Sequence, residues 1–408
     1  MPSTSIPTGV LSSTAAKVAV AVAFLAIGGV AAAQMGAFGG VMDTSTHQAV
    51  DQVPDDVDSV ASFDPAVLER DVTDRLYVTA YNATVRPSEA PANETETGED
   101  GEEDFGDDDE VTTSPVEMVP TNLTAAFDSA ENETGLDPRA AEDVVFFNRQ
   151  RENFTQPRYA GAIVHADWEK DEVREAVENN TDKEYVNTTV NGAIVYQPAE
   201  SENESEEERT FGPPEPEQWV AVLGDGEYVF GTEQAVNDTI AVEYGDAEAL
   251  DGDLREAYDD TRDGYVRYAQ RSQNVNVTRV NRTLGRQTGL NVTAYAEAYN
   301  GLYITSGSYY ITDDGDALGF QSKTLTNSTD TARDVADLTQ GFISIQAGAI
   351  QNETIEEQLR ATEVTREDTT VTVTREVPVD VAEKLIRWFG AAIQPDDRRG
   401  SAAAQPIA

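Results

Sequence analysis

The chain has 408 residues, of which 39% are hydrophobic and 8% aromatic, so it is long and apolar enough to form about two folded units. Its 76 acidic and 28 basic residues leave a formal net charge of -48 at pH 7. Such a surface disfavours nucleic-acid binding, which needs clustered Lys and Arg, and it makes inorganic cations the natural counter-ions. The absence of cysteine excludes disulfides, thiolate zinc sites, cysteine nucleophiles and a lipid anchor on cysteine.

The acidic residues are spread along the whole chain, whereas only five of the 28 basic residues are lysine. At low salt this charge would strain a compact state, but at about 1 M salt the Debye length falls to about 3 Å and screens the repulsion. The composition therefore predicts a protein adapted to molar salt, of the kind found in haloarchaea. An acidic disordered protein is the alternative, and the strand patterns described below argue against it for most of the chain.

The N-terminal residues predict export. Lys17 is followed by an uninterrupted run of small and apolar residues at 18–33, and no acidic residue precedes Asp43. The run ends in three alanines, which resemble a signal-peptidase site, so we expect cleavage there. One alternative is an uncleaved anchor, since the low-charge stretch up to Asp43 would reach about 37 Å as a helix. Another is a buried Ala-rich core helix. Either a leader or an anchor flanked by one lysine leaves the rest of the chain outside the cell.

The asparagines give a second indication of an extracellular location. Fourteen of the 19 asparagines lie in N-x-S/T motifs, whereas about three would match by chance if Ser and Thr make up about a sixth of the residues. Each occupied site would mark a solvated position. The candidate glycosylation residues are Asn82, Asn93, Asn122, Asn132, Asn153, Asn179, Asn187, Asn203, Asn237, Asn276, Asn281, Asn291, Asn327 and Asn352.

The first ordered segment after the export signal is expected at 63–85, with a helix at 65–74 and an alternating strand at 76–81. Residues 94–110 are almost entirely Glu, Asp, Gly and Thr, so we expect a solvated, disordered insertion at 87–114. A role in collecting calcium is the alternative interpretation of this insertion. A second acidic patch at 200–208 runs into three prolines and predicts a long surface loop.

Residues 121–245 have the clearest pattern. A buried strand at 159–164 precedes a helix at 168–178, which Asp167 would cap. Asn191-Gly192 joins strands at 185–190 and 193–196, because both positions of a type I′ turn require positive φ. A second hairpin is expected from strands at 219–223 and 228–230, followed by a helix that begins after Thr232.

The later part of the chain predicts strands and then helices. Strands are expected at 274–280, 292–299, 302–312 and 318–326, with a turn at 313–316. Helices at 331–350 and 355–361, a strand at 369–377 and an amphipathic helix at 379–393 follow. Strands followed by helices in both halves predict an α+β fold of two mainly antiparallel sheet-plus-helix units.

This organisation predicts seven segments. They are 1–45 (signal peptide or membrane anchor plus linker), 46–86 (a short α/β segment joining the first unit), 87–114 (acidic disordered insertion), 115–245 (first α+β unit), 246–273 (helical connector), 274–394 (second α+β unit) and 395–408 (disordered tail).

Residues that carry chemistry are hard to single out. His47 and His165 are the only histidines and lack metal-ligand spacing, so His165 is interpreted as a structural residue at a strand edge. Signatures of serine nucleophiles, phosphate-binding glycine loops and H-E-x-x-H are absent. We therefore assign no catalytic, cofactor-binding or metal residue. A pair of carboxylates acting as a hydrolase dyad stays open, because any two of the 76 acids could form one.

Two acidic turns and a group of tyrosines have competing interpretations. The segment 259–264 resembles the start of an EF-hand, but its twelfth position is Gln270 instead of Glu. The segment 313–316 is interpreted as a hairpin turn, with cation binding as the alternative. Cross-strand packing is the first interpretation of the tyrosines and a sugar-stacking or partner surface the second. They are Tyr295, Tyr299, Tyr303, Tyr309 and Tyr310.

Several motifs in chain order carry a resemblance to a group of proteins. They are Thr134-Gly135-Leu136-Asp137-Pro138, Tyr159-Ala160-Gly161-Ala162-Ile163-Val164, Trp168 with its helix, Val195-Tyr196, Val220-Ala221-Val222 and Val229-Phe230-Gly231. Over about 121–377 this pattern resembles uncharacterised secreted haloarchaeal proteins. The resemblance implies an extracytoplasmic α+β protein and transfers no functional residues.

Together these patterns favour a non-enzymatic glycoprotein of the cell envelope that acts through contacts with surface partners or as part of the coat. It would touch the membrane only through an uncleaved N-terminal segment. The alternatives are an extracellular hydrolase that uses carboxylates and an extracytoplasmic protein that binds a small molecule or a glycan. The hydrolase predicts a deep cleft with converging acids and few glycans at its rim. The envelope protein predicts glycans over most faces and no such cleft, and the binding protein predicts an aromatic-lined pocket between the two units.

Overall fold

The computed structural model describes residues 48–84, 122–150, 158–179, 184–199, 217–272, 298–349 and 352–393. The predicted leader, the insertion at 87–114, the acidic patch at 200–208, the strand at 274–280 and the C-terminal tail lie outside these residues. Of the strand predicted at 292–299, only Ala298 and Tyr299 are described, and both are helical.

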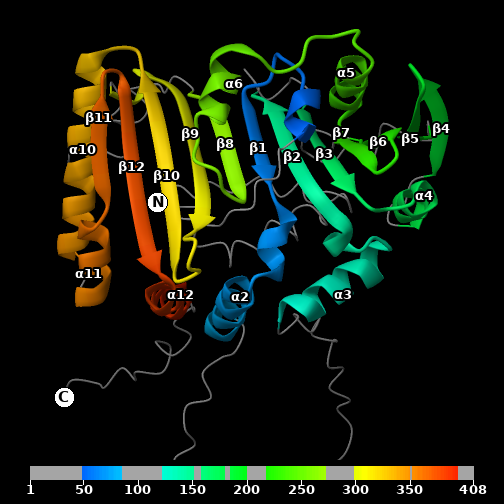
Figure 1. Ribbon diagram of the computed structural model, residues 1–408. Coiled ribbons are helices and arrows are strands. Elements are labelled where there is room, and N and C mark those ends of the chain that lie inside the picture. The colour runs from blue at the N-terminus through cyan, green and yellow to red at the C-terminus, as the bar shows by residue number, and fades with distance from the viewer. Residues whose placement is uncertain are drawn as a thin grey trace, which may run out of the picture.

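The described strands form one antiparallel sheet (Figure 1). Its twelve strands follow the order β11-β12-β10-β9-β8-β1-β2-β3-β7-β6-β5-β4. Their bounds are β1 Ser59–Phe63, β2 Ala141–Arg149, β3 Tyr159–Ala166, β4 Tyr185–Val190, β5 Ala193–Pro198, β6 Trp219–Gly224, β7 Glu227–Gly231, β8 Val266–Arg271, β9 Leu302–Ile311, β10 Ala317–Thr326, β11 Glu363–Glu367 and β12 Thr370–Pro378.

Helices cover this sheet. The described α-helices are α2 Asp71–Thr84, α3 Leu123–Thr134, α4 Lys170–Asn179, α5 Glu233–Glu243, α6 Gly252–Asp259, α10 Thr329–Ala349, α11 Glu353–Arg360 and α12 Val379–Ile393. The 3-10 helices are η3 Gln48–Gln52, η4 Pro65–Glu69 and η5 Pro138–Ala140. The combination of an antiparallel sheet with packed helices confirms the predicted α+β class.

The core has two layers, one on each face of the sheet. Successive residues of a strand point to opposite faces, so Val144 and Val145 of β2 belong to different hydrophobic clusters. The first cluster includes buried residues of α2, α3 and α4, and the second includes those of η3, α5 and α6. The helices α10 and α11 lie at the end of the sheet that β11 forms (Figure 1).

The local hairpin signals are confirmed. Asn191 and Gly192 have φ of 51° and 113°, as a type I′ turn between β4 and β5 requires. The hairpin of β6 and β7, the strand β3, the helices α4 and α5, the strands β9, β10 and β12 and the helices α10, α11 and α12 also form near the predicted positions. These signals are short-range, because each depends on residues that are neighbours in the chain.

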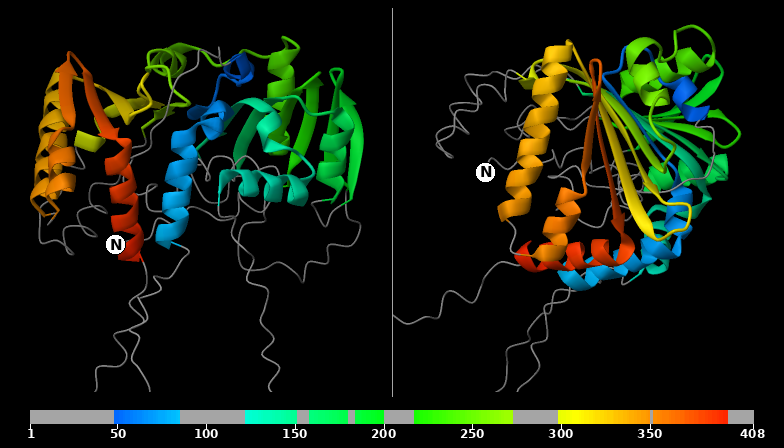
Figure 2. Two further views of the ribbon diagram at one scale, coloured as in Figure 1. Left: turned by 60° about the horizontal axis from the view of Figure 1, so that its bottom comes forward. Right: turned by 60° about the vertical axis from the view of Figure 1, so that its left-hand side comes forward.

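The strand predicted at 76–81 is wrong, because α2 continues through it to Thr84. Its buried residues include Val72, Thr73, Tyr77 and Ala80, which recur at helical spacing. α2 lies alongside α12, with many contacts between them (Figure 2). Packing against α12 thus overrides the strand preference of the Val, Thr and Tyr residues in this segment. The helix predicted at 65–74 is divided into η4 and the first turn of α2.

The sequence analysis did not predict the strands β1, β2, β8 and β11 or the helix α3. Of these, β1 and β8 change the architecture. β1 pairs with β2 on one side and with β8 on the other. The region predicted as a helical connector therefore contributes a strand, and strands from both predicted units belong to one continuous sheet. β1 has only five residues, so a pattern of alternation is too short to detect. The domain boundaries along the chain remain predictions.

Two glycines allow close approach between neighbouring strands. A Cβ on Gly231 would lie 2.5 Å from the carbonyl oxygen of Ala160, and a Cβ on Gly161 would lie 2.3 Å from Cζ of Phe147. The first contact is with backbone, which cannot turn aside as a side chain can. Gly231 thus fixes how closely β7 and β3 meet.

Candidate functional site

The candidate glycosylation residues lie mostly on the surface. The structure describes eight of the 14 sequon asparagines, and seven of these eight are exposed. The exposed residues are Asn82 on α2, Asn122 and Asn132 at α3, Asn179 on α4, Asn187 on β4, Asn327 between β10 and α10, and Asn352 before α11. Asn93, Asn153, Asn203, Asn276, Asn281 and Asn291 lie outside the described residues.

Three of these asparagines also serve local structure through the side-chain oxygen. Oδ1 of Asn122 accepts a hydrogen bond of 2.8 Å from the backbone N–H of Ala125 and caps α3. Oδ1 of Asn352 caps α11 in the same way, and Oδ1 of Asn327 accepts a bond of 2.8 Å from Oγ1 of Thr331. A glycan attaches to Nδ2, so capping and glycosylation use different atoms of the same side chain.

Asn237 is the exception. It lies within α5 and is half-buried, and the hydroxyl residue of its sequon, Thr239, has no exposed surface. Oγ1 of Thr239 donates a hydrogen bond of 2.9 Å to the carbonyl oxygen of Ala235. An enzyme that modifies the folded chain cannot reach this hydroxyl, so Asn237 differs physically from the seven exposed sequons.

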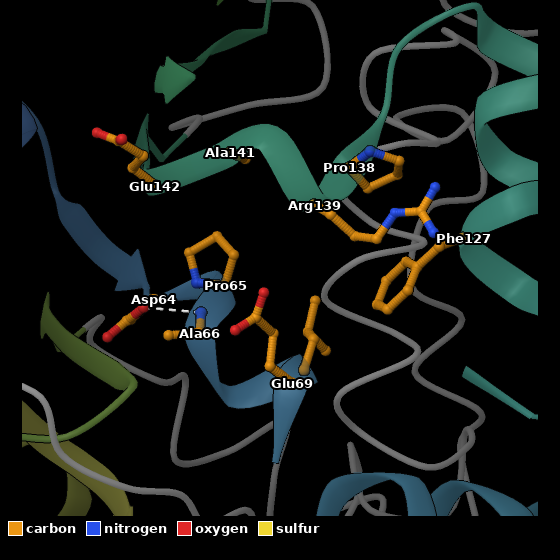
Figure 3. Close-up of a pocket in the computed structure, with 10 residues that line it drawn as sticks. Asp64, Pro65, Ala66, Glu69, Phe127, Pro138, Arg139, Ala141 and Glu142 are labelled. Atoms are coloured by element: carbon orange, nitrogen blue, oxygen red, sulfur yellow. Dashed lines mark hydrogen bonds between the residues drawn. The ribbon is translucent and has the colours of Figure 1, made fainter. Parts of the chain in front are cut away.

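A cavity of about 460 Å³ opens between η4, α3 and the start of β2 (Figure 3). Two Asp-Pro pairs begin the 3-10 turns beside it. Oδ1 of Asp64 accepts a bond of 2.9 Å from the N–H of Ala66, and Asp137 caps η5 similarly. The apolar part of the lining consists of Pro65, Ala66, Leu68, Phe127, Pro138 and Ala141, and the polar part of Asp64, Glu69, Arg139 and Glu142.

The charge of Arg139 in this lining is balanced by its own neighbours. Its guanidinium donates to Asp137 at 2.7 Å, to Glu131 at 2.8 Å and to Asp128 at 3.0 Å. The hydrogen bond with Asp137 is the main cause that raises the pKa of Arg139. With that cation bound by three carboxylates, Glu69 and Glu142 leave the lining with surplus negative charge.

The structure places His165 among polar groups near the end of β3. It lies opposite Asp143 of β2 and opposite Glu227 of β7 in the sheet register. Nε2 of His165 lies 3.5 Å from Oε1 of Gln52, whose Nε2 donates to Glu243 at 2.9 Å. Within the described residues no group of three or more His, Asp or Glu side chains has a metal-binding arrangement. His47 lies outside them.

The segment that resembles the start of an EF-hand is bound by basic side chains. Asp259 pairs with Arg255 at 2.9 Å, Asp260 with Lys323 at 3.1 Å, and Asp263 with Arg267 at 3.6 Å. Gln270 lies within β8. Arginine and lysine side chains thus already neutralise the three carboxylates of this loop. A calcium ion would have to compete with them for the same oxygens.

The turn at 313–316 forms as predicted. Oγ1 of Thr312 donates a hydrogen bond of 2.6 Å to Oδ1 of Asp314, and Gly315 adopts a φ of 74°. The bond from Thr312 is the largest cause that lowers the pKa of Asp314. These contacts hold the carboxylate inside the turn.

The described tyrosines divide between packing and exposure. Tyr309 stacks on Tyr268 with ring centroids 6.0 Å apart and packs on Phe320 at 4.8 Å. Tyr310 is fully buried beneath Arg262, and burial raises its pKa to about 12. Tyr299 and Tyr303 are 37% and 46% exposed. The packing interpretation fits the first pair, and the surface interpretation fits the second. Tyr295 lies outside the described residues.

No sequence pattern indicated one half-buried acid, Asp238. The hydroxyl of Tyr159 donates a hydrogen bond of 3.1 Å to Asp238, and the guanidinium of Arg149 lies 4.0 Å from the centre of the same ring. Burial is the largest cause that raises the pKa of both Tyr159 and Asp238. These residues are 79 positions apart, so no local pattern brings them together. The two Asp-Pro pairs beside the cavity, by contrast, are a local signal that could have been used.

Comparison with known proteins assigns the chain to no family. No protein-family model and no curated protein matches the sequence. A solved structure titled "Structure of crystal form I of TP0453" is similar over 83% of this chain and 96% of that chain, with a TM-score of 0.36 and 9% identity. No helix among the described residues is long and apolar enough to cross a membrane.

Proposed function

We propose that this chain is an exported, N-glycosylated protein of the cell envelope, adapted to high salt, which acts through surface contacts instead of catalysis. The observation that supports this proposal is the exposure of seven of the eight described sequon asparagines. These residues lie on α2, α3, α4, β4 and the segments that precede α10 and α11. Glycans at these positions would cover both ends of the sheet and keep other macromolecules at a distance.

The acidic surface fits the same role. Several acids form ion pairs with arginine or lysine on the surface, as in Arg75–Glu383 at 2.7 Å and Lys170–Asp225 at 2.7 Å. Exposed pairs of this kind contribute little to stability, and the 76 acids far outnumber the basic residues. The excess charge binds hydrated cations and keeps the protein dissolved in concentrated salt. The sequence resemblance to secreted haloarchaeal proteins leads to the same proposal.

The location can be tested on intact cells of the native host with an amine reagent that does not cross membranes. The side chains of Lys170 and Lys384 are 46% and 57% exposed, so both are accessible in the folded protein. We expect both lysines to be labelled on intact cells as fully as in the purified protein. Labelling that appears only after the cells are broken would place the protein inside and contradict the proposal.

The cavity beside η4 supports a second candidate function, the binding of a small organic cation. Its lining includes Leu68 and Phe127, which are 6% and 5% exposed and form part of its apolar wall. Glu69 and Glu142 give its lining the charge that an ammonium group would neutralise. Inorganic cations match the charge but gain nothing from the apolar part of the lining, so a ligand with both features would be selected over them.

Titration calorimetry with 2-phenylethylammonium tests this candidate, with phenylacetate and 2-phenylethanol as probes of opposite and zero charge. We expect the ammonium probe to bind more tightly than either, and E69Q and E142Q to weaken it by about tenfold each. E256Q, which changes an exposed glutamate on α6, is the matched control and should have no effect. Equal binding of all three probes would show that the two glutamates do not select for charge. No binding of any probe would show that the cavity is not a binding site for such ligands.

A further inference from the structure

β4 is the last strand of the sheet within the part of the chain that the structure describes (Figure 1). Its six residues, Tyr-Val-Asn-Thr-Thr-Val, include no charged residue, although 25% of the whole chain is charged. The four central residues are exposed, and Val186 has 45% of its surface accessible. An uncharged, exposed strand of Val, Thr and Tyr is a ready template for another strand.

The hydrogen-bond pattern shows which residues of β4 present their backbone to the open edge. The N–H of Ala199 donates a bond of 2.8 Å to the carbonyl oxygen of Glu184 in the register that β4 and β5 share. Bonded pairs alternate along an antiparallel ladder, so the even-numbered residues of β4 bond to β5. Tyr185, Asn187 and Thr189 therefore direct their N–H and C=O groups outward. Asn187 is the middle residue of the three.

The opposite end of the sheet is protected in another way. β11 has the sequence Glu-Val-Thr-Arg-Glu, so three of its five residues are charged, and α10 packs against it. Charged side chains and a covering helix are common means by which proteins prevent pairing at a sheet edge. β4 has neither a charge nor a proline, and its centre is a sequon, Asn187-Thr188-Thr189.

We propose that a glycan on Asn187 acts as an edge cap, which prevents β4 from pairing with β4 of a second copy of this chain. The proposal rests on the glycosylation argued above and assigns a separate task to one site. A docking strand would lie about 4.8 Å from β4 and would have to pass the residue that carries the sugar. The side chain of Asn187 is exposed, so the sugar would lie at the centre of the edge that a partner needs.

A second copy is the expected occupant of the uncapped edge because the strand is self-complementary. Two β4 strands in antiparallel alignment would place Thr, Val and Tyr opposite one another, with no like charges in contact. The net charge of -48 would hold two copies apart at low salt, but at about 1 M salt the Debye length is about 3 Å and this protection is lost. In the salt to which the protein is adapted, a steric cap replaces electrostatic repulsion.

The test compares two variants of the full chain produced in the native glycosylating host. N187Q removes the sequon on β4, and N132Q removes an exposed sequon on α3 as the control. Light scattering in concentrated KCl gives the molar mass, and hydrogen exchange reports on the β4 amides. We expect the molar mass of N187Q to double as its concentration rises. Hydrogen exchange of the β4 amides should at the same time slow by about tenfold or more. N132Q should stay monomeric with unchanged exchange.

A second substitution separates edge pairing from misfolding. V186K places a charge on the same strand, so N187Q combined with V186K should return to the monomer without a glycan. If N187Q stays monomeric, or dimerises with unchanged exchange at β4, the edge cap is wrong. Glycopeptide mass spectrometry of the native protein is run in parallel. An occupied Asn187 together with a monomeric N187Q overturns only the cap, whereas a bare Asn187 overturns the cap and removes this site from the proposed function.

Discussion

At the scale of single residues, the structure depends on a few positions where there is no room for a side chain. Gly231 is one, because an added Cβ would meet the backbone of β3. We expect G231A to lower the free energy of unfolding by about 1 to 3 kcal/mol, since the strands must move apart. G341A is the control: Gly341 lies in α10 with nothing within 4 Å, so alanine there should raise stability by about 0.5 to 1 kcal/mol. Denaturant unfolding measures both, and equal effects of the two changes would contradict this account.

The titration of Tyr258 gives a prediction about pH. Tyr258 is 1% exposed, and burial raises its pKa from 10 to about 12. Between about pH 10 and 12 the unfolded chain loses this proton while the folded chain keeps it. The stabilisation is therefore complete below pH 10 and is lost as the pH rises through 12, by up to about 3 kcal/mol.

Y258F removes this titration and also the hydrogen bond of 2.6 Å to Oγ of Ser62. The variant should be less stable than the wild type at pH 8 by about 1 kcal/mol. Because the wild type loses up to about 3 kcal/mol by pH 12, the order should reverse between pH 10 and pH 12, and Y258F should then be the more stable protein. Urea unfolding over this pH range is the measurement. A difference that stays constant from pH 8 to pH 12 would show that Tyr258 does not couple folding to the proton.

The residue types that the sequence analysis identified correctly are those whose signal is local. Asn191 and Gly192 predict their turn because positive φ is a property of those two residues. The contact of Tyr159 with Asp238 and the lining of the cavity depend on distant segments, which no local pattern encodes.

At the scale of elements, α2 illustrates the limit of local reasoning. Its 14 residues include Val, Thr and Tyr, which favour strands, and its partner α12 is 295 residues further along the chain, counted from Thr84 to Val379. The helix is thus stabilised by packing and not by its own propensity. The short strand β1 was missed for a related reason. Its five residues are too few to show a strand pattern, and pairing with β2 and β8 stabilises the strand.

A peptide of residues 71–84 tests this explanation. We expect it to be mostly unordered in water, because a 14-residue segment with several β-branched residues forms a helix poorly without a partner. Circular dichroism gives the helical content directly. A strongly helical peptide would mean that residues 71–84 favour a helix by themselves. The strand prediction would then have misjudged their local preference, and packing against α12 would not be the cause.

At the scale of the whole molecule, one sheet joins what the sequence divides into two units. The α+β class followed from the succession of strands and helices, but the continuity of the sheet depends on β1, which is remote in sequence from β8. The entropic cost of closing a loop grows only slowly with its length, so strands far apart in the chain can pair almost as readily as near ones. The length of chain between β1 and β8 therefore gives little indication that they pair.

The net charge belongs to this scale as well, and it predicts a strong dependence on salt. Raising KCl from about 0.1 M to 1 M shortens the Debye length from about 10 Å to 3 Å. We expect the melting temperature to rise across this range, because the repulsion among surplus acids is screened. Near pH 4, where about half of the carboxylates are protonated, the rise should be much smaller. A melting temperature that falls with added KCl at pH 7 would be incompatible with adaptation to salt.

The most direct test of the account is glycopeptide mass spectrometry of the mature protein isolated from the envelope of its native host. We expect sugars on the exposed asparagines and a bare Asn237, because Thr239 is buried within α5. Recovery of the protein from the cytosol, with every sequon asparagine unmodified, would contradict it.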